Sequence, residues 1–533
     1  MGALTLKSFP FELRGWDIEK FESIDPTDGF GSDTRLYIKN HQIIQIEPDY
    51  NSYSFNSWLT DKGRQFFDGI FSNSYDKNNN IDNLSWLKTL DYIQQNIYFF
   101  DHCNTQSKKI NYFVIVFENL SLEVISLLNV ISQNYSFIKI KRAQNHKLVN
   151  DFEASFQLNS SIERENILAS NLCLLVNNNP RYEGFQLNLT LRQRFLKGNF
   201  KCFNLGSNLN TTFPISFLGS TVTTLKTIAE GNHLICQDFK SSVNPIIIFN
   251  SDIYQRDDGK KLIEMFQKVK NTNIFAKKWN GINVLNSSLS ETGIYSTAHI
   301  LPIKANDFID FSGICFINTS IDSFSNLRKV IQLKTLNSLL NKTFSIDKTR
   351  ICLDQNFYKQ MNSSVNKALS TKYLYIPTSM FYENNETYIN TEGFIKRTTK
   401  LVFDNNSAKS NWQILRKLLK SFKQNFISVN TNDNDIVYFN ANKLLLFKNF
   451  INFQFYATQH LSNTSYYFQI KNKPFNLNKS NSTYKLKPMK IRDTKLKYWL
   501  DDFFIGGKDE YSSNSAILTN CSRILRTEST NFF

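Results

Sequence analysis

Residues Asn171–Arg194, NLCLLVNNNPRYEGFQLNLTLRQR, combine a buried-type strand, a polar turn and a helical pattern. Leu172–Val176 is a short continuous apolar run bounded by Asn and Pro, as in a parallel strand that helices cover on both faces. Turn formers occupy Asn177–Pro180. Apolar side chains then recur four residues apart within Leu187–Phe195, which predicts one face of a helix. The stretch therefore predicts an α/β fold.

A loop between such a strand and such a helix lies at the carboxyl edge of the sheet. Open α/β sheets bind ligands at that edge, and a helix start favours anions. Arg181 and Glu183 are therefore the first polar side chains to consider for a functional site. The structural alternative is an ion pair, mutual or with a neighbour, that only orients the loop. No Gly-x-Gly-x-x-Gly pattern is present in this stretch, which disfavours ordinary dinucleotide binding.

The composition is typical of a globular protein with several domains. A chain of 533 residues is long enough for about three or four domains, and a hydrophobic share of 41% supplies a sizeable core. No apolar run approaches the roughly 20 residues that cross a bilayer, and the first ten residues lack the pattern of a secretory signal. We therefore expect no membrane-spanning segment.

The net charge of +16 permits binding to nucleic acid, to an anionic membrane surface or to acidic proteins. Lysine and arginine are scattered, however, and neither zinc-finger spacing nor the aromatic-basic signature of an RNA-binding sheet occurs. The distribution therefore disfavours a nucleic-acid partner. The abundant Asn, Lys, Ile, Phe and Tyr residues share A/T-rich codons, so part of the positive charge can reflect an A/T-rich genome such as that of an organelle.

The cysteines are too dispersed for a metal or iron-sulfur site within this chain. No two of them form a C-x-x-C pair, although such centres usually draw on local clusters. The six histidines are dispersed as well. We therefore expect neither an iron-sulfur cluster nor a metal ion to be bound by this chain. The seven cysteines are Cys103, Cys173, Cys202, Cys236, Cys315, Cys352 and Cys521.

The chain divides into three predicted parts. Residues 1–70 contain short strands and tight turns, with Thr34–Ile38 and Gln42–Ile46 as paired strands and Trp58–Phe67 as a short helix, and form a small β-rich lead domain. Residues 71–400 alternate strands and helices as two Rossmann-like lobes with parallel sheets. Residues 401–533 form an α/β extension that ends in a loop and a helix within Tyr511–Arg526.

The strands of residues 71–400 fall into two successive series along the chain. The first series is Tyr112–Phe117, Phe137–Ile140, Leu172–Val176 and Lys201–Leu205. The second series is Pro245–Phe249, Ile314–Ile317 and Tyr373–Ile376, with a helix at Gly259–Lys268. This order predicts one sheet from each series.

Short motifs in a fixed order resemble one known family. They are G-A-L-T at Gly2–Thr5, R-G-W-D-I at Arg14–Ile18, E-S-I-D at Glu22–Asp25, G-S-D-T-R at Gly31–Arg35, W-L-T-D-K-G-R at Trp58–Arg64, N-P-R-Y-E at Asn179–Glu183, Q-R-D-D-G at Gln255–Gly259, T-Y-I-N-T-E-G at Thr387–Gly393 and W-Q-I-L-R at Trp412–Arg416. Together they resemble the large iron-sulfur, or seventy-five-kilodalton, subunit of respiratory complex I, the NADH:ubiquinone oxidoreductase. No single motif is decisive, but the ordered set covers nearly the whole chain.

The resemblance implies a molybdopterin-oxidoreductase-like fold, in which two lobes once gripped a pterin cofactor that complex I no longer uses. Arg181, Glu183, Asn390 and Glu392 are then candidates for a vestigial pocket. Related sequences follow N-T-E-G with Arg and Gln, but here Phe394 and the next residue are apolar, which weakens a polar ligand site. The structural alternative, which we favour, is that Asn390 and Glu392 bond backbone in a loop.

The resemblance also implies a split subunit. In that family the iron-sulfur half comes first, so the clusters are expected on a separate, cysteine-rich amino-terminal polypeptide. Gly2, Ala3, Leu4 and Thr5 would then lie as a second shell around a cluster of that partner. The chain is expected to be a structural half-subunit of the peripheral arm, with no catalytic residue and no cofactor of its own, supporting the iron-sulfur path from NADH to ubiquinone among other complex I subunits. Tyr511–Arg526 resembles the terminal segment of the family and would be a docking tail that contacts another subunit.

The implied location is the matrix side of the mitochondrial inner membrane, peripheral to the bilayer, with synthesis inside the mitochondrion. Two alternatives remain at this point. An active molybdopterin-dependent oxidoreductase would bind pterin with molybdenum or tungsten. A basic nucleic-acid-binding protein would bind DNA or RNA with strong salt dependence.

Overall fold

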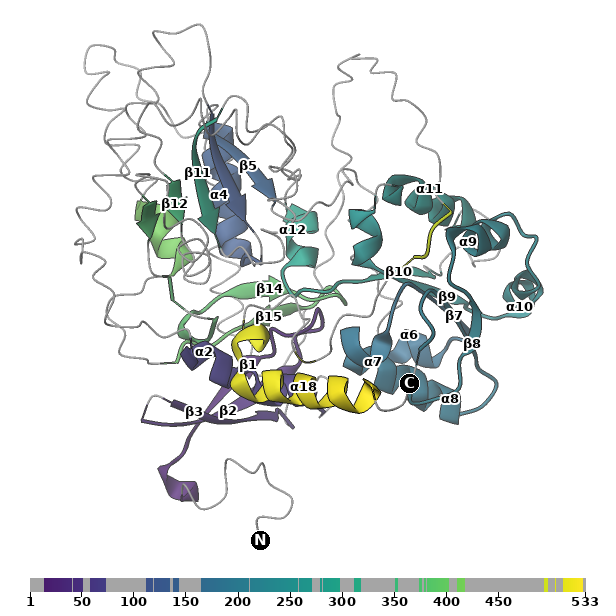
Figure 1. Cartoon of the computed structure of the whole chain (residues 1–533), viewed down its shortest axis with the longest axis horizontal. Helices are drawn as coiled ribbons and strands as arrows, with labels where there is room; N and C mark the ends of the chain where they lie inside the picture. Colours follow the sequence, from purple (N-terminus) through teal and green to yellow (C-terminus); the bar gives the residue numbers. More distant parts are fainter. Residues whose placement is uncertain are drawn as a thin grey trace, which may run out of the picture.

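The structure of the chain is a computed structural model, and it describes about half of the residues. The described residues are 14–40, 42–50, 58–72, 112–117, 119–134, 138–142, 164–209, 211–256, 258–270, 279, 281–297, 311–317, 350–352, 373–375, 378–379, 381–401, 410–417, 493–496, 504 and 511–530. Within them lie two parallel sheets, an antiparallel sheet and a two-stranded hairpin (Figure 1).

The first parallel sheet has the strand order β10-β9-β6-β7-β8. Its strands are β6 (Leu172–Val176), β7 (Lys201–Leu205), β8 (Ser216–Gly219), β9 (Ile246–Asn250) and β10 (Ile282–Leu285). Every residue of β6, β9 and β10 is buried, because helices cover both faces of the sheet. The strand predicted from the apolar run Leu172–Val176 is thereby confirmed. We call this sheet and its helices the inserted lobe.

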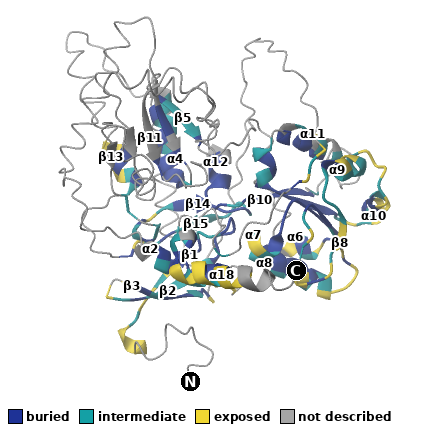
Figure 2. Ribbon diagram, viewed as in Figure 1, coloured by how far each residue is buried: buried dark blue, intermediate teal, exposed yellow. Residues whose placement is uncertain are grey.

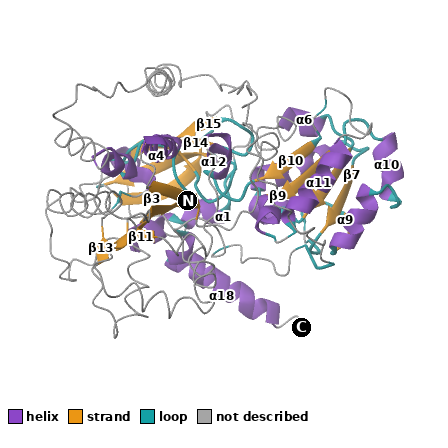
Figure 3. Ribbon diagram, turned by 90° about the horizontal axis from the view of Figure 1, so that it is seen from above, coloured by secondary structure: helices purple, strands orange, loops and turns teal. Residues whose placement is uncertain are grey.

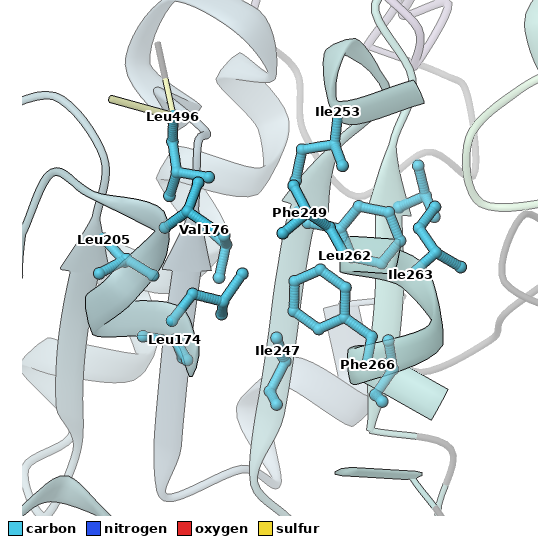
Figure 4. Close-up of a cluster of buried hydrophobic side chains, with 14 of the residues drawn as sticks. Leu174, Val176, Leu205, Ile247, Phe249, Ile253, Leu262, Ile263, Phe266 and Leu496 are labelled. Atoms are coloured by element: carbon cyan, nitrogen blue, oxygen red, sulfur yellow. The ribbon is translucent and has the colours of Figure 1, made fainter. Parts of the chain in front are cut away.

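Two separate cores lie on the two faces of this sheet. One core involves α6 (Arg164–Leu168) and α8 (Phe185–Leu196), which follows the short helix α7 (Pro180–Glu183). The other involves α9 (Val222–Ala229), α10 (Ile235–Ser241) and α11 (Gly259–Lys270). In the second core the rings of Phe249 and Phe266 stack at 4.7 Å (Figure 4). Figure 2 shows the buried strands between partly exposed helices.

The second parallel sheet has the order β13-β12-β11-β4-β5. Its strands are β4 (Tyr112–Phe117), β5 (Ile138–Arg142), β11 (Phe311–Ile317), β12 (Arg350–Cys352) and β13 (Tyr373–Tyr375). Helix α4 (Leu122–Asn134) follows β4, and helix α12 (Glu291–Thr297) lies against α4. We call this sheet and its helices the split lobe, because its strands come from both sides of the inserted lobe in the sequence. The two lobes lie side by side when seen from above (Figure 3).

The grouping of strands into two successive series is therefore wrong, although two α/β lobes are present. The predicted first series mixed β4 and β5 with β6 and β7, but β4 pairs with β11 and β6 pairs with β9. Apolar runs of similar length carry no signal of which strand is the neighbour, so order along the chain was a poor guide.

The lead part forms an antiparallel sheet of β1 (Glu19–Ile24), β2 (Asp33–Lys39) and β3 (Gln42–Pro48) after a short 3-10 helix, η2 (Gly15–Asp17). The predicted pair of strands is confirmed. Helix α1 (Asp61–Gln65) begins later than predicted, because the side chain of Thr60 accepts from the N–H of Gly63 and caps it. Helix α2 (Phe67–Ser72) follows.

Segments from the second half of the chain complete the lead domain. They are η6 (Phe381–Glu383), the hairpin of β14 (Thr387–Ile389) and β15 (Ile395–Arg397), η7 (Ser512–Asn514) and α18 (Ala516–Thr530). Leu518 of α18 is buried in one core with Leu36, Phe66 and Tyr382. The predicted docking tail thus packs on the lead domain of its own chain, while the outer side of α18 is exposed (Figure 2).

No helix in the described part of the chain is long and apolar enough to cross a membrane. The domain limits 1–70, 71–400 and 401–533 stay predictions, because long stretches around them lie outside the described residues.

Candidate functional site: the carboxyl edges of the two parallel sheets

Both parallel sheets contain a topological switch point, where neighbouring strands connect in opposite directions. In the inserted lobe it lies between β6 and β9, and in the split lobe between β4 and β11. Ligands of open α/β proteins bind in the crevice beyond the carboxyl ends of such strands. These two edges are therefore where the fold itself would hold a ligand.

Glu183 bridges the two strand ends at the switch point of the inserted lobe. Its Oε2 accepts a hydrogen bond from the backbone N–H of Asn179 at 2.9 Å, just after β6. The same oxygen accepts from Nδ2 of Asn250, the last residue of β9, at 2.8 Å. A carboxylate of this chain thus lies where the crevice begins, and it orients the loop through hydrogen bonds to a backbone N–H and to an asparagine amide.

Arg181 belongs to the same loop but lies over the ring of its neighbour Tyr182, with 5.8 Å between the guanidinium carbon and the ring centre. Its backbone N–H donates to Oδ1 of Asn179, which caps the short helix α7. The predicted proximity of Arg181 and Glu183 to the carboxyl edge is confirmed, and the partners of Glu183 include two asparagines that the sequence did not single out.

One side of this edge is filled by a loop of the lead domain, Asp28–Ser32. Phe30 is buried in the core that contains Leu187, Leu191 and Leu285. A hydrogen bond of 2.7 Å from Nε2 of Gln186 to the hydroxyl of Ser32 ties the same loop to α8. An aromatic ring from outside the lobe, that of Phe30, therefore closes this side of the edge.

The loop fits closely because Gly29 has no side chain. A Cβ at Gly29 would collide with the backbone oxygen of Asn286, which follows β10, and with the hydroxyl of Thr391. The backbone N–H and the hydroxyl of Thr391 both donate to the Gly29 carbonyl at 2.9 Å. Gly31 adopts φ 57°, a left-handed conformation that suits glycine.

Asn390 and Glu392 lie in the turn of the β14–β15 hairpin. Nδ2 of Asn390 donates to the carbonyl of Phe30 at 3.0 Å, and its Oδ1 accepts from the N–H of Phe394 at 2.8 Å. Nδ2 also donates to Glu392 at 3.2 Å. Asn390 therefore bonds backbone, as the structural alternative held, and it holds Phe30 in place.

The other side of the edge is covered by Asp493–Leu496, a segment we call the strap. The backbone N–H of Val222 donates to the carbonyl of Thr494, and the N–H of Leu496 donates to the carbonyl of Ser220. Leu496 is buried above Val176 and Leu205 (Figure 4). The strap therefore seals the carboxyl ends of β6, β7 and β8.

Arg256 holds the strap through the Q-R-D-D-G motif. Its guanidinium donates to the carbonyl of Lys495 at 2.8 Å and to the hydroxyl of Thr494 at 2.8 Å. Two further hydrogen bonds, at 2.9 and 3.1 Å, join it to both oxygens of Asp258. The forked donor pattern of arginine thus links η4 (Ser251–Gln255) and α11 to the strap.

The switch point of the split lobe also contains a glutamate. Glu123, in the first turn of α4, is buried, and its Oε2 accepts from the backbone N–H of Thr387 in β14 at 3.1 Å. Beside it, the hydroxyl of Ser290, which precedes α12, donates to Oδ1 of Asn119 after β4 at 3.2 Å. The loops that follow β4 and β10 therefore touch through the hydrogen bond between Ser290 and Asn119, whereas Glu123 contacts the lead-domain hairpin.

Burial shifts the titration of two carboxyl groups near these edges. Burial raises the pKa of Asp28 to about 6, opposed by hydrogen bonds from the N–H groups of Phe30 and Gly31. Burial also raises the pKa of Glu386 to about 7, opposed by the hydroxyl of Tyr388 at 2.7 Å and reinforced by the nearby charge of Glu123. Both groups lie at the junction of the lead domain and the lobes.

The described residues contain no group of three or more His, Cys, Asp or Glu side chains placed to hold a metal ion. Cys173 and Cys202 lie opposite each other on β6 and β7 and are buried, and burial raises the pKa of the Cys202 thiol. A buried protonated thiol is a poor metal ligand. Gly2–Thr5, the expected second shell around a cluster of the partner, lie outside the described residues.

A pterin cofactor with a phosphate tail does not fit the described carboxyl edge of the inserted lobe. Phe30 and Leu496 occupy the two sides of the edge in the inserted lobe, and the Glu183 carboxylate would face the phosphate charge. The close approach of Gly29 to Asn286 leaves no gap there for a ring system. We therefore derive no chemistry through such a cofactor for this chain.

Sequence reasoning missed several of the residues that close the site. Phe30, Glu123, Arg256 and Leu496 come from distant parts of the chain, and their patterns are those of ordinary loops and helices. The quoted motifs were the available signal, since Arg256 lies in Q-R-D-D-G and Phe30 directly precedes G-S-D-T-R.

Two parallel doubly wound sheets, with the loops after β4 and β10 in contact, define a two-lobed α/β protein. The chain belongs to the molybdopterin oxidoreductase family, whose model matches residues 74–421. The solved structure of acetylene hydratase from Pelobacter acetylenicus shares this fold with a TM-score of 0.50 and 9% identity, over 76% of this chain and 69% of that one.

Several relatives with established names are similar to this chain over most of its length. The chain is 28% identical to the NADH-ubiquinone oxidoreductase 75 kDa subunit of Reclinomonas americana, over 78% of this chain and 59% of the relative. It is 24% identical to the mitochondrial NADH-ubiquinone oxidoreductase 78 kDa subunit of Candida albicans, over 78% of this chain and 54% of the relative. It is 26% identical to an NADH-quinone oxidoreductase subunit from Rickettsia typhi, over 78% of this chain and 57% of the relative. These relatives confirm the resemblance drawn from the motifs. The chain spans a little more than half of their length.

Proposed function

We propose that the chain is a structural subunit of the peripheral arm of respiratory complex I, where it supports the iron-sulfur path from NADH to ubiquinone. The names of the relatives support the assembly, since each is an NADH-ubiquinone or NADH-quinone oxidoreductase subunit. Redox chemistry in such an assembly belongs to the cofactors, and the protein supplies position, burial and dielectric.

The observation that carries a structural role is the closure of the carboxyl edge by the chain itself. Phe30 and Leu496 fill its two sides, and Glu183 bridges the strand ends. An enzyme of this fold needs that crevice for its ligand. A chain that fills the crevice with its own side chains is suited to hold neighbours in place.

We further propose that the partner at the amino-terminal side is a cysteine-rich polypeptide that carries the iron-sulfur clusters. The dispersed cysteines of this chain support the division, because cluster ligands are usually grouped. Gly2–Thr5 would lie beside one of those clusters. Other complex I subunits would cover further surfaces, on the matrix side of the mitochondrial inner membrane.

Co-purification tests the assembly. A tag on the carboxyl terminus of the chain, followed by mild detergent extraction of mitochondria and native purification, should recover NADH-oxidising complex I together with a cysteine-rich polypeptide. Recovery of the chain by itself, in a fraction that lacks NADH dehydrogenase activity, would contradict the proposal.

Metal analysis and cluster spectra test the division of labour. The assembled complex should contain iron but neither molybdenum nor tungsten, and the isolated chain should contain none of the three. Stoichiometric molybdenum or tungsten would support an active pterin enzyme instead. Replacing Gly2–Thr5 should alter the electron paramagnetic resonance spectrum of one reduced cluster. An unchanged spectrum in the assembled complex would contradict the proposed contact between Gly2–Thr5 and a cluster.

A further inference from the structure

We infer that Glu123 and Glu183 serve as internal anions at the two switch points, in the places where a phosphate-bearing ligand would otherwise bind. The inference deepens the proposed structural function and rests on it, because it explains how both lobes are complete without a ligand. Each glutamate follows the first strand of its sheet, β4 or β6, within the next loop or helix turn.

Glu183 makes the contacts that a bound anion would make. Its Oε2 accepts from a backbone N–H after β6 and from the Asn250 amide at the end of β9, so it joins the two strands that flank the switch point. Phosphates in open α/β proteins are recognised at this edge by the same classes of donor, backbone N–H groups and polar side chains. A protein carboxylate already satisfies them here.

Glu123 has the corresponding position in the split lobe. It lies in the first turn of a thirteen-residue helix, α4, where a negative charge is stabilised by the helix dipole. Its carboxylate is buried and accepts from the backbone N–H of Thr387. Each lobe therefore has a glutamate after the first strand of its sheet. Glu183 accepts from a strand end of its own sheet, whereas Glu123 accepts from the hairpin of the lead domain.

The edge of the inserted lobe keeps polar capacity that the glutamate does not use. Both side-chain polar atoms of Asn178 are buried and have no hydrogen-bond partner among the described residues, and the same holds for Oδ1 of Asn177. These amides directly precede Asn179, which donates to Glu183. Removing the Glu183 side chain should therefore leave the N–H of Asn179, the Asn250 amide and the unpartnered Asn178 amide nitrogen as donors for a small anion.

The test uses the full chain with the substitutions Glu183→Gln and Glu183→Ala. Glu183→Ala vacates the place of the carboxylate and leaves its two donors without this acceptor. We expect it to bind inorganic phosphate or pyrophosphate at least tenfold more tightly than the wild type, measured by calorimetry, and to unfold at a lower temperature, with part of the loss regained in acetate or phosphate. Glu183→Gln fills the same space and keeps an oxygen that can accept from the same donors, so it should bind phosphate no more tightly than the wild type.

Glu165→Ala is the matched control, because Glu165 also lies in the first turn of a helix of the same lobe but is exposed. It should show neither tighter phosphate binding nor rescue by anions beyond that of the wild type. Glu123→Ala tests the split lobe in the same way. If Glu183→Ala does not fold, phosphate binding is measured on Glu183→Ser, which also vacates the place of the carboxylate.

Two outcomes would overturn the inference. One is stoichiometric binding of pyrophosphate or a nucleoside diphosphate by the wild type, and the other is equal phosphate affinity of the wild type and Glu183→Ala. Neither outcome affects co-purification with complex I. Conversely, a chain that fails to co-purify would refute the proposed function while leaving the anion measurements valid, so the two failures can be told apart.

Discussion

The inserted lobe and the split lobe have the same kind of sheet but are built differently along the chain. The inserted lobe takes its five strands from one continuous stretch, Leu172–Leu285, and buries both faces of β6, β9 and β10. The split lobe joins β4 and β5 to β11, β12 and β13 from beyond that stretch. Both place a glutamate at the switch point, although their sheets are connected differently along the chain.

The two lobes also differ in what closes them. Side chains cover the edge of the inserted lobe, Phe30 on one side and Leu496 on the other. The described part of the split lobe is joined to the lead domain by a hydrogen bond between Glu123 and β14. Apolar packing should therefore dominate the stability of the inserted lobe, while the split lobe should respond to pH.

The largest effect is expected for Phe249→Ala in the inserted lobe. Phe249 is fully buried and stacks on Phe266 at 4.7 Å, so the substitution leaves a cavity and should cost about 3–5 kcal/mol of unfolding free energy. Chemical unfolding of the full chain measures the loss. Phe217→Ala, on the edge strand β8 with 48% of the side chain exposed, is the control and should cost far less. Equal losses would show that the lobe is loosely packed.

A pH-dependent effect is expected for Glu386 beside the split lobe. Burial raises its pKa from 4.5 to about 7, so the folded chain keeps a proton that the unfolded chain loses. This contribution is fully present below pH 4.5 and is lost as the pH rises through 7, a decrease of about 3 kcal/mol. Glu386→Gln should make the unfolding free energy less dependent on pH between 5 and 8, roughly by this amount.

A comparison with an exposed carboxylate supplies the control for this prediction. Glu264→Gln, on the exposed side of α11, should leave the pH profile of unfolding as it is in the wild type. Identical profiles for Glu386→Gln and the wild type would show that Glu386 is already ionised in the folded chain, and the proposed pH response of this junction would then be wrong.

A smaller effect is expected for Arg256→Ala at the strap. The substitution leaves the buried carboxylate of Asp258 without its ion pair and releases the carbonyl of Lys495, which should cost about 2 kcal/mol. Arg256→Lys should recover little, because an ammonium group cannot reproduce the forked contacts. Arg192→Ala, exposed on α8, is the control. Proteolysis near Leu496 should accelerate in Arg256→Ala, and an unchanged rate would contradict the role of the strap.

The smallest effect is expected for the ion pair between Lys396 of β15 and Asp33 of β2. The side-chain nitrogen of Lys396 lies 2.7 and 2.8 Å from the two carboxylate oxygens of Asp33, and both side chains are partly buried. A double-mutant cycle with Lys396→Met and Asp33→Asn should give a coupling of about 1 kcal/mol. The exposed pair Lys226–Glu230 on α9 should give about 0.3–0.5 kcal/mol. A larger coupling energy for Lys226–Glu230 than for Lys396–Asp33 would show that the Lys396–Asp33 pair does not stabilise the contact between the hairpin and the lead sheet.

Much of the local structure could be predicted from the sequence. Leu172–Val176 is a strand with the predicted limits, and the predicted strands Thr34–Ile38 and Gln42–Ile46 lie within β2 and β3. Apolar periodicity and turn residues act over a few positions, so they can be read locally. The start of α1 was placed too early, because the capping contact of Thr60 decided it.

Parts of the candidate site could be predicted as well. Arg181 and Glu183 were placed at the carboxyl edge from the strand, turn and helix pattern alone, and Asn390 was expected to bond backbone. Phe30 and Leu496 could not be predicted as the residues that close this edge, because each is an ordinary apolar side chain whose neighbours lie far away in the sequence. Long-range packing leaves no periodic signal.

The sequence by itself determined the class of fold, the family through its ordered motifs and the position of the first switch-point loop. These three features follow from patterns of apolar and turn residues that extend over only a few positions, so they can be recognised in the sequence itself. Only the tertiary structure decided which strands share a sheet and that the carboxyl edge is closed by Phe30, the strap and Glu183. The physical reason is that pairing and burial depend on contacts between residues distant in sequence, and many apolar segments satisfy them equally well until the chain is folded.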